Sequence, residues 1–511
     1  MTKLKAALGA LALALLLAGC TLGPDYERPK LSMPVQFKAS EGWKPAKPSA
    51  ALERGAWWEL YDDATLNKLV GQLNRANQNI AASEAQYRQA RALVRGTRSQ
   101  FFPVFTTDAS AERTGRGSNN YNINAPKASI DLPSGDSMTT GGNVARINTG
   151  GVDNDYSLGI GASWEADVWG RLRRTLEGEK ANLQASQADL ASARLSMQSE
   201  LVQNYLQIRV LDQQMRLMKD TTDAYQRSLD LTQNQYEAGL VPRSDVSQAQ
   251  TQLSNAKAER VDLEWRRAQL ENAIAVLLGL PPADFKLPAV DSVPKLPDIP
   301  TILPSELLER RPDVAASERA VMAANAQIGV AKSAWFPSLS LSAYGGYYYN
   351  HLSGLIDTPN RFWSIGPQIG MELLDFGGRS AEVGRTKAAY HQTVAQYRQT
   401  VLQSLREVED YMVQLSVFTR ESVERDAALQ AARQSWHSME DQYQGGMVDY
   451  SDVVQQQTAA LNTELSRLTL QGNRLTASVR LIVALGGGWS TAQLGDHKQS
   501  KPNKNLATPK G

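Results

Sequence analysis

The sequence repeats itself, and this internal duplication limits its possible folds more than any other feature. Matched segments occur in the same order in both halves of the chain. The pairs are 79–84 with 313–318, 102–103 with 336–337, Asp167 and Gly170-Arg171 with Asp375 and Gly378-Arg379, 236–239 with 443–446, 245–246 with 452–453, and 278–279 with 485–486. An ordered series of this kind is typical of duplication, so both halves are predicted to fold on one plan.

Each half is predicted to contain a helix, two strands, a very long helix, a tight turn and a final helix. The stretches 170–236 and 378–443 lack proline and carry apolar residues at heptad spacing. At about 1.5 Å per residue, each long helix would reach on the order of 100 Å. The shorter helices, 65–100 with 244–279 and 306–334 with 451–485, are predicted to stack end to end along the long ones. Helical periodicity alone fits a solenoid or an extended coiled-coil scaffold equally well.

Two segments alternate between apolar and polar or glycine residues, which predicts strands with one apolar face. They are 156–167 and 363–373, with partners predicted near 101–113 and 335–348. Pro367 interrupts the second segment and predicts a local bulge. The lengths suit tilted membrane strands, although a soluble sandwich would show the same alternation.

The number of predicted strands bears on the oligomeric state. Four strands are too few to close a barrel, since the smallest membrane barrels need about eight and lipid tolerates no open edge. If the strands lie in a membrane, several copies must combine. A dimer with eight strands and a trimer with twelve both satisfy this requirement.

The first residues predict export and lipid attachment. Lys3 and Lys5 precede a short apolar run at 6–18, and small residues lead to Cys20, the one cysteine of the chain. This pattern is typical of a signal peptide over 1–19 followed by a lipid-modified Cys20, such as a palmitate-bearing lipoprotein. An ordinary buried cysteine is the alternative. Beyond this segment, no apolar stretch is long enough to span a bilayer as a helix.

Composition argues against nucleic-acid binding and against catalysis. Lys and Arg number 54 and Asp and Glu number 53, so the basic footprint of a nucleic-acid binder is missing. The four histidines are scattered, and no phosphate-cradling loop or nucleophile elbow is present. We therefore expect no catalytic residue, no metal and no cofactor other than the lipid on Cys20, as in a passive conduit.

The connections are predicted to lie at opposite ends of the repeat. Residues 114–152 and 349–361 are expected to be solvated loops. Gly239 and Gly446 suit left-handed helix ends at the other turns, after which Ser244-Asp245 and Ser451-Asp452 can cap the next helices. Alternatively, Asp449 and Asp452 repeated around an oligomer axis would form acidic rings that narrow a channel.

Four motifs resemble those of TolC-like outer-membrane efflux factors, in the lipoprotein branch of multidrug efflux systems. They are 23–26 with Pro29, Trp57-Trp58 with Leu66 and Leu69, 310–313, and 485–489. The resemblance covers almost the whole mature chain. It implies a mainly α fold with a membrane β-barrel, built as a trimer with a twelve-stranded barrel and a periplasmic helical tunnel. It also implies a periplasmic adaptor and an inner-membrane transporter as partners.

The resemblance also implies a division of the chain. The parts are a signal peptide (1–19), a lipidated segment and equatorial belt (20–64), a first repeat (65–280), a linker or belt (281–305), a second repeat (306–486) and a tail (487–511). The expected function is the outer-membrane channel of a tripartite efflux pump that extends into the periplasm. A structural coiled-coil lipoprotein of the periplasm is the alternative, and an outer-membrane enzyme would need a site that the sequence does not show.

At the turns, the resemblance implies a periplasmic gate and a surface for the adaptor. The gate residues are Asp245, Tyr443, Asp449 and Asp452, with Asp245 and Tyr443 as candidate latch partners. The adaptor-contacting residues are Gly239, Leu240, Val241, Gly446, Met447 and Val448. The sequence departs from some family members at Val448, where they carry a latch arginine, and at Gln455, where they carry a second gate aspartate.

Overall fold

A computed structural model describes residues 21–34, 36–38, 55–116, 151–299 and 307–494, with the backbone of four short strands between 120 and 148. The signal peptide, Cys20 and the tail beyond 494 lie outside the described residues. The chain forms two compact units. The sheet unit contains Arg95–Leu176 and Gly329–Val383 with residues 21–23, and the helical unit contains the described parts of 24–94, 177–328 and 384–494.

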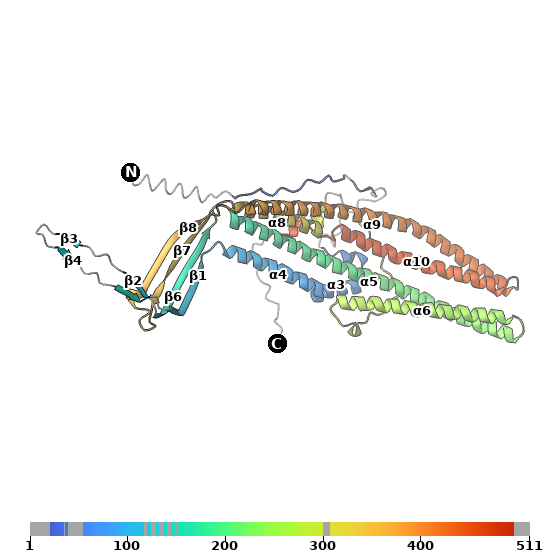
Figure 1. Ribbon diagram of the computed structural model, residues 1–511. Helices are drawn as coiled ribbons and strands as arrows, with labels where there is room; N and C mark the ends of the chain where they lie inside the picture. The colour runs from blue at the N-terminus through green and yellow to red at the C-terminus, as the bar shows by residue number, and fades with distance from the viewer. Residues whose placement is uncertain are drawn as a thin grey trace. The chain divides into compact units, whose positions relative to one another are not determined.

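The sheet unit is built on one antiparallel sheet in the order β1-β6-β7-β8 (Figure 1). Its strands are β1 (Val104–Arg116), β6 (Gly151–Ala166), β7 (Ser338–Tyr349) and β8 (Arg361–Gly370). All four predicted strands are confirmed. The connection 114–152 was predicted as a loop, but it also contains two short strand pairs. They are β2 (Asn120–Ile123) with β5 (Ala145–Asn148), and β3 (Ser129–Asp131) with β4 (Ser137–Thr139).

The bulge predicted at Pro367 is wrong. The register of β7 with β8 is continuous from Ser338 opposite Gly370 to Tyr347 opposite Arg361, with Leu341 opposite Pro367. Within the described chain, β8 is an edge strand. Edge strands accept proline because part of their N–H groups face away from the neighbouring strand.

The helices follow the predicted repeat. The two long helices, α5 (Arg171–Glu237) and α9 (Gly378–Gln444), each contain 67 residues. The others are α3 (Ala64–Ala76), α4 (Gln78–Ser99), α6 (Arg243–Leu277), α7 (Leu307–Arg310), α8 (Pro312–Ser333) and α10 (Tyr450–Ala484), with short 3-10 turns η2 (Trp57–Tyr61), η3 (Pro282–Asp284), η5 (Thr358–Asn360) and η6 (Thr491–Gln493). Figure 1 shows α6 folding back beside α5 and α10 beside α9.

The helices predicted at 65–100 and 306–334 are each interrupted at one residue, which contacts the end of another helix. At the second break Arg311 precedes Pro312, which disfavours a helical conformation at Arg311. Asn77 separates α3 from α4; its side chain accepts from the Ile80 N–H and donates to the Leu277 carbonyl at the end of α6. Arg311 separates α7 from α8 and donates to the Ala484 carbonyl at the end of α10. The predicted end-to-end stacking is therefore confirmed in both halves.

The core of the helical unit lies where these helix ends meet. Leu201, Ile208 and Val408, three of the heptad positions, are fully buried there. The N-terminal segment contributes Trp57, which has no exposed surface, and Tyr61, whose hydroxyl lies 2.7 Å from the Ser478 hydroxyl. Segments outside the repeats thus complete the core at the level of the helix junctions.

Candidate functional site

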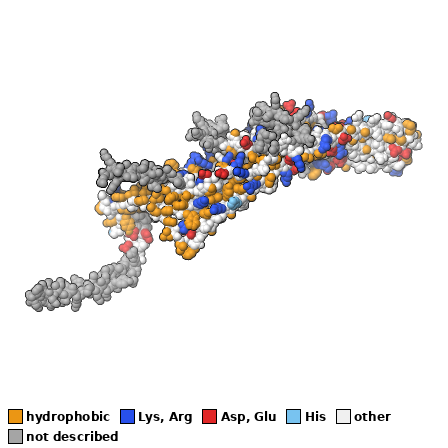
Figure 2. All heavy atoms as spheres, turned by 90° about the horizontal axis from the view of Figure 1, so that it is seen from above, with side chains coloured by type: hydrophobic (Ala, Val, Ile, Leu, Met, Phe, Trp, Pro, Cys, Tyr) orange, Lys and Arg blue, Asp and Glu red, His pale blue; other side chains and the backbone are white. Residues whose placement is uncertain are grey.

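One face of the four-stranded sheet is apolar and exposed. In rows of directly opposed residues, Phe105 faces Ala162, Ala343 and Ile365 in turn, and the next row brings Ile160 and Trp363 to the same face. The larger side chains are strongly exposed, at 74% for Phe105, 66% for Ile160 and 73% for Trp363. Figure 2 shows hydrophobic side chains gathered over the sheet unit. A face of this kind requires an apolar environment.

The other face of the sheet is polar and rich in glycine. The Tyr344 hydroxyl donates to the Asp108 carboxylate at 2.6 Å. The Tyr344 ring crosses Gly159 so closely that any Cβ at this position would overlap the hydroxyl. The alternation predicted from the sequence thus separates a face suited to lipid from a face suited to water.

At the foot of the sheet, aspartates fix the start of both long helices. The Asp167 carboxylate accepts from the backbone N–H groups of Leu172 and Arg173, each at 3.0 Å. Asp375 accepts from the Arg379 N–H at 2.7 Å and pairs with its guanidinium, and these bonds lower the pKa of Asp375 to about 2. An anionic cap is favourable at a helix N-terminus.

The glycine turns before the long helices correct one sequence match. Gly170 adopts φ +80° directly before α5, and Gly377 adopts φ +97° directly before α9. Gly377 is therefore the structural equivalent of Gly170, in place of the Gly378 chosen from the sequence. The equivalence shifts by one residue because α9 begins at Gly378 itself.

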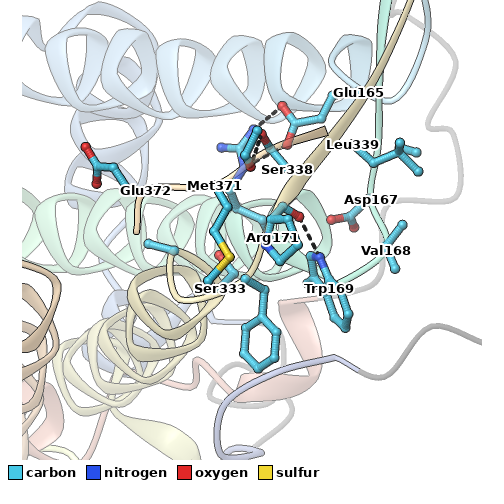
Figure 3. Close-up of a pocket in the computed structure, with 15 residues that line it drawn as sticks. Glu165, Asp167, Val168, Trp169, Arg171, Ser333, Ser338, Leu339, Met371 and Glu372 are labelled. Carbon is cyan, nitrogen blue, oxygen red and sulfur yellow. Dashed lines mark hydrogen bonds and ion pairs between the residues drawn. The ribbon is translucent and has the colours of Figure 1, made fainter. Parts of the chain in front are cut away.

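A cavity of about 310 Å³ lies at the foot of the sheet (Figure 3). The Trp169 indole donates to the Pro337 carbonyl at 2.7 Å, and Arg171 forms a two-point ion pair with Glu165. The charges of Arg171 and Glu165 therefore compensate each other at the wall of this cavity. We interpret the residues that line this cavity as a rigid junction between the strands and the helices.

At the far end of the helical unit, both hairpin turns have one geometry. Gly239 and Gly446 adopt φ +73° and +70°, as predicted. In each turn the glycine N–H and the following N–H bond back to the last helical turn, for example Leu240 N–H to the Gln235 carbonyl at 2.9 Å. This is the Schellman arrangement, in which glycine avoids the strain of a left-handed conformation.

The two hairpins of one chain are joined through two tyrosines. The Tyr443 hydroxyl donates to the Gln235 side chain at 3.2 Å, and the Tyr450 hydroxyl lies 2.9 Å from the Ser228 hydroxyl. The tyrosine rings are 5.5 Å apart. The sequence predictions missed Gln235, Ser228 and Tyr450. Ser228 and Gln235 are seven residues apart on one face of α5, whereas Tyr443 and Tyr450 lie on either side of the glycine turn, at the end of α9 and the start of α10.

The candidate gate aspartates occupy different surroundings. Asp245 is half-buried. The pKa of Tyr443 is raised first by the burial of Tyr443 itself and then by the negative charge of Asp245. Within the described chain the hydroxyl of Tyr443 nevertheless bonds to Gln235, and no direct bond joins it to Asp245. Asp449 and Asp452 are exposed. The structure thus brings Asp245 near Tyr443 and leaves Asp449 and Asp452 at the surface.

The predicted caps at these turns are wrong. The N-cap residues are Pro242 for α6 and Asp449 for α10, and neither side chain makes a capping bond. Asp245 and Asp452 lie inside the first turn of their helices. There they favour the helix through its dipole only.

The predicted adaptor-contacting residues form the extreme ends of both hairpins. Leu240 is 75% exposed and Met447 is 70% exposed. Val241 and Val448 are half-buried behind them. Each turn therefore presents one large apolar side chain on a glycine-based support.

Among the described residues, no group of three or more His, Cys, Asp or Glu side chains is placed to hold a metal ion. None of the described helices combines the length and apolarity needed to cross a membrane.

The family model described as outer membrane efflux protein matches residues 69–280 and 303–487. The chain belongs to this family, and its fold is that of the TolC-like channels, with a helical tunnel and a barrel. It is an outer-membrane efflux channel component that extends into the periplasm, which confirms the function expected from the sequence over the structural-lipoprotein alternative.

Named relatives cover nearly the whole chain. It is 27% identical over 502 residues to the probable efflux pump outer membrane protein TtgC of Pseudomonas putida, with 98% of each chain covered. It is 27% identical over 487 residues to the cation efflux system protein CusC of Escherichia coli, covering 93% of this chain and 97% of CusC. The solved outer-membrane channel OprN superposes with a TM-score of 0.79 at 28% identity, over 92% of this chain and 100% of OprN.

Proposed function

We propose that three copies of this chain form the outer-membrane duct of a tripartite efflux pump. The observation that carries the proposal is the sheet, whose exposed face is apolar and whose outer strands each have one partner within the described chain. Unpaired edges are not tolerated in lipid, so strands of other copies must complete the barrel. Three copies give the twelve strands that the family resemblance implies.

The duct conducts drugs or other toxic compounds passively, from an inner-membrane transporter and a periplasmic adaptor to the exterior. Relatives named for toluene efflux, antibiotic efflux and cation efflux are each 27% identical to this chain. Overall similarity therefore does not separate these cargoes. We attribute the choice of cargo to the transporter, and the chain itself performs no catalysis.

The lipid anchor is assigned to Cys20. Support comes from the next residues, because Thr21 packs beside Gly170 and the Leu22 N–H donates to the Trp169 carbonyl at 3.3 Å. Thr21 thus lies at the foot of the sheet, where a barrel strand meets the periplasmic side of the membrane. Cys20→Ser is expected to lose incorporation of labelled palmitate. Retained label would contradict the assignment.

The gate is assigned to the hairpin ends. Tyr443 and Tyr450 tie the second hairpin to the first, and Asp245, Asp449 and Asp452 supply negative charge around the opening. The exposed Leu240 and Met447 provide apolar contacts for the adaptor. Leu240→Asp with Met447→Asp is expected to abolish drug resistance in cells while leaving the yield of outer-membrane trimer unchanged.

The barrel assignment is tested by two neighbouring residues on opposite faces of β8. Ile365 is 64% exposed on the apolar face, whereas Ser364 lies on the other face. Ile365→Lys is expected to cost about 2–4 kcal/mol if this position is near the bilayer midplane. Ile365→Lys should greatly reduce the amount of trimer in outer membranes, measured by native mass spectrometry after detergent extraction. Ser364→Lys is the matched control, and equal loss in both variants would refute the assignment.

A further inference from the structure

The last helices of the two halves, α6 and α10, can be compared residue by residue. Both contain 35 residues, and both begin four residues after an equivalent glycine turn. Four charged positions on one face of α6 have direct equivalents on α10. In order they are Arg260, Glu264, Arg267 and Glu271 on α6, and Arg467, Gln471, Arg474 and Ser478 on α10. The second half keeps both arginines and has lost both carboxylates.

In the first half, the guanidinium of Arg267, whose side chain is 13% exposed, has an acceptor for each of its nitrogen atoms. The Arg267 guanidinium donates to Asp212 at 2.7 Å, to Glu271 at 3.0 Å and to the Leu287 carbonyl at 2.7 Å. Asp212 is 2% exposed and also pairs with Arg209. The linker between the halves is held here, because Val290 donates its N–H to Asp212. The charge and hydrogen-bonding capacity of Arg267 are therefore matched inside the chain, whereas the Nε atom of Arg260 is buried without a hydrogen-bond partner among the described residues.

In the second half, the same position is a pocket. Thr419 replaces Asp212, and its hydroxyl donates to the Leu415 carbonyl of its own helix. The Nε atoms of Arg467 and Arg474 are buried and have no hydrogen-bond partner among the described residues. The nearest ion-pair partner of Arg467 is Asp426, at 3.9 Å. A buried guanidinium N–H without an acceptor costs about 1–3 kcal/mol or more.

The pocket has a volume of about 280 Å³ and two kinds of wall. Its polar wall carries the two arginines with Gln471, Ser422 and Asp426. Exposed Lys295 adds a third positive charge, so positive charge exceeds the single negative charge of Asp426. Its apolar wall is supplied by the linker and by α10, through Val293, Pro294, Leu296, Leu470 and Leu475. Basic groups opposite an apolar wall suit a ligand with an anionic head and a short hydrocarbon body.

We propose that this pocket, formed by α10 and linker residues 293–296, binds a carboxylate. The carboxylate takes the position that Asp212 and Glu271 occupy in the first half, with Arg467 and Arg474 donating to its two oxygens. A guanidinium fork matches the two oxygens of a carboxylate, and such charge-assisted bonds are the strong ones. The hydrocarbon part of the ligand lies against Val293 and Leu296. The site is separate from the gate and from the sheet, so it does not depend on the proposed gating.

Hexanoate is the probe for this site, with hexanamide as its uncharged control. Binding to the full-length protein in lipid nanodiscs is measured by saturation-transfer NMR and calorimetry. We expect saturable binding of hexanoate and none of hexanamide. Arg474→Met is expected to weaken binding at least tenfold, whereas Arg260→Met, at the equivalent of Arg467 in the first half, leaves it unchanged.

A second variant tests the same point without removing an arginine. Gln471→Glu restores the glutamate that the first half carries at Glu264, and its carboxylate would compete with the ligand. We expect it to weaken hexanoate binding at least tenfold and to raise the melting temperature. Equal hexanoate binding in the wild type, Arg474→Met and Gln471→Glu would overturn the proposal.

Carbodiimide coupling at Lys295 identifies the source of the carboxylate. One possible result is a covalent product between two copies that is absent in Lys295→Arg and that blocks hexanoate binding. This result would assign the carboxylate to an acidic side chain of a second copy. Hexanoate binding without such a product assigns a free organic acid. If neither hexanoate binding nor a coupled product is observed, the proposal is wrong.

Discussion

The two halves of the chain keep the same backbone at their helix junctions but balance charge differently. Each half has a glycine with positive φ at this junction. Gly279 lies against the carbonyl of Ala76 at the end of α3, and Gly486 lies against the carbonyl of Arg310 at the end of α7. In both halves, a polar side chain at the helix break donates to the end of the final helix. At the equivalent positions Arg267 and Arg474, only the arginine of the first half is bonded to carboxylates.

This difference shows which requirements a duplicated fold enforces. A positive φ beside a carbonyl admits only glycine, so the backbone feature persists in both copies. A buried charge can be balanced in several ways, so its partners can change once the fold exists. The comparison predicts that equivalent substitutions in the two halves have unequal effects.

The largest expected difference is between Asp212→Asn and Thr419→Val. Asp212 pairs with buried Arg209 and with partly buried Arg267, and removing its charge is expected to cost about 3–5 kcal/mol of unfolding free energy. Thr419 makes one local bond to its own helix, and its loss is expected to cost about 1 kcal/mol or less. Urea unfolding followed by circular dichroism measures the unfolding free energy of both variants. Equal losses would contradict the different charge balance of the two halves.

A smaller difference is expected between glycines at the junction and at the hairpin ends. Gly446 has φ +70°, and a Cβ added there would meet no other atom within 4 Å. Gly446→Ala is therefore expected to lower the unfolding free energy by about 1–2 kcal/mol through backbone strain alone. Gly486 has φ +96°, so Gly486→Ala also introduces backbone strain, and its Cβ would in addition overlap the Arg310 carbonyl, for an added cost of about 1–3 kcal/mol. Thermal unfolding of the two variants should therefore give a clearly lower midpoint for Gly486→Ala. A midpoint for Gly446→Ala at or below that of Gly486→Ala would contradict this account of the junction.

The hairpin ends should respond to alkaline pH. Burial first, and then the charge of Asp245, raise the pKa of Tyr443 above its ordinary value of 10.0. The contribution of the neutral hydroxyl is thus fully present below pH 10 and is lost as the pH rises through the higher folded pKa. Channel conductance in planar bilayers is expected to rise in that range. The same response in Tyr443→Phe with Tyr450→Phe would show that these hydroxyls are not its cause.

The smallest expected effect concerns the start of α9. Arg379 lowers the pKa of Asp375 from 3.8 to about 2. The stabilisation is therefore present above about pH 3.8 and is lost as the pH falls through 2. Asp375→Asn should slightly lower the melting temperature at pH 7 and weaken its dependence on pH between 2 and 4. If the melting temperature of Asp375→Asn depends on pH as steeply as that of the wild type, Asp375 does not contribute to the loss of stability in acid.

The sequence was sufficient for the repeat, the long helices and the strands, because each has a periodic signal over many residues. It failed at Asn77, whose side chain contacts the distant end of α6, and it overlooked the helix break that Pro312 causes at Arg311. It also failed at Pro367, because its position on an edge strand depends on strand order. At the hairpin ends, the nearness of Asp245 to Tyr443 was predicted, but the bond to Gln235 was not, since it joins helices far apart in the sequence.

Single-channel recording shows whether copies of this chain form a passive duct that is gated at its hairpin ends. The purified full-length protein is reconstituted in planar bilayers and compared with Asp245→Ala combined with Asp452→Ala. We expect discrete small conductance steps for the wild type and larger steps for the double variant. Unchanged steps in the double variant would contradict the gate, and bilayers without any steps would contradict the duct.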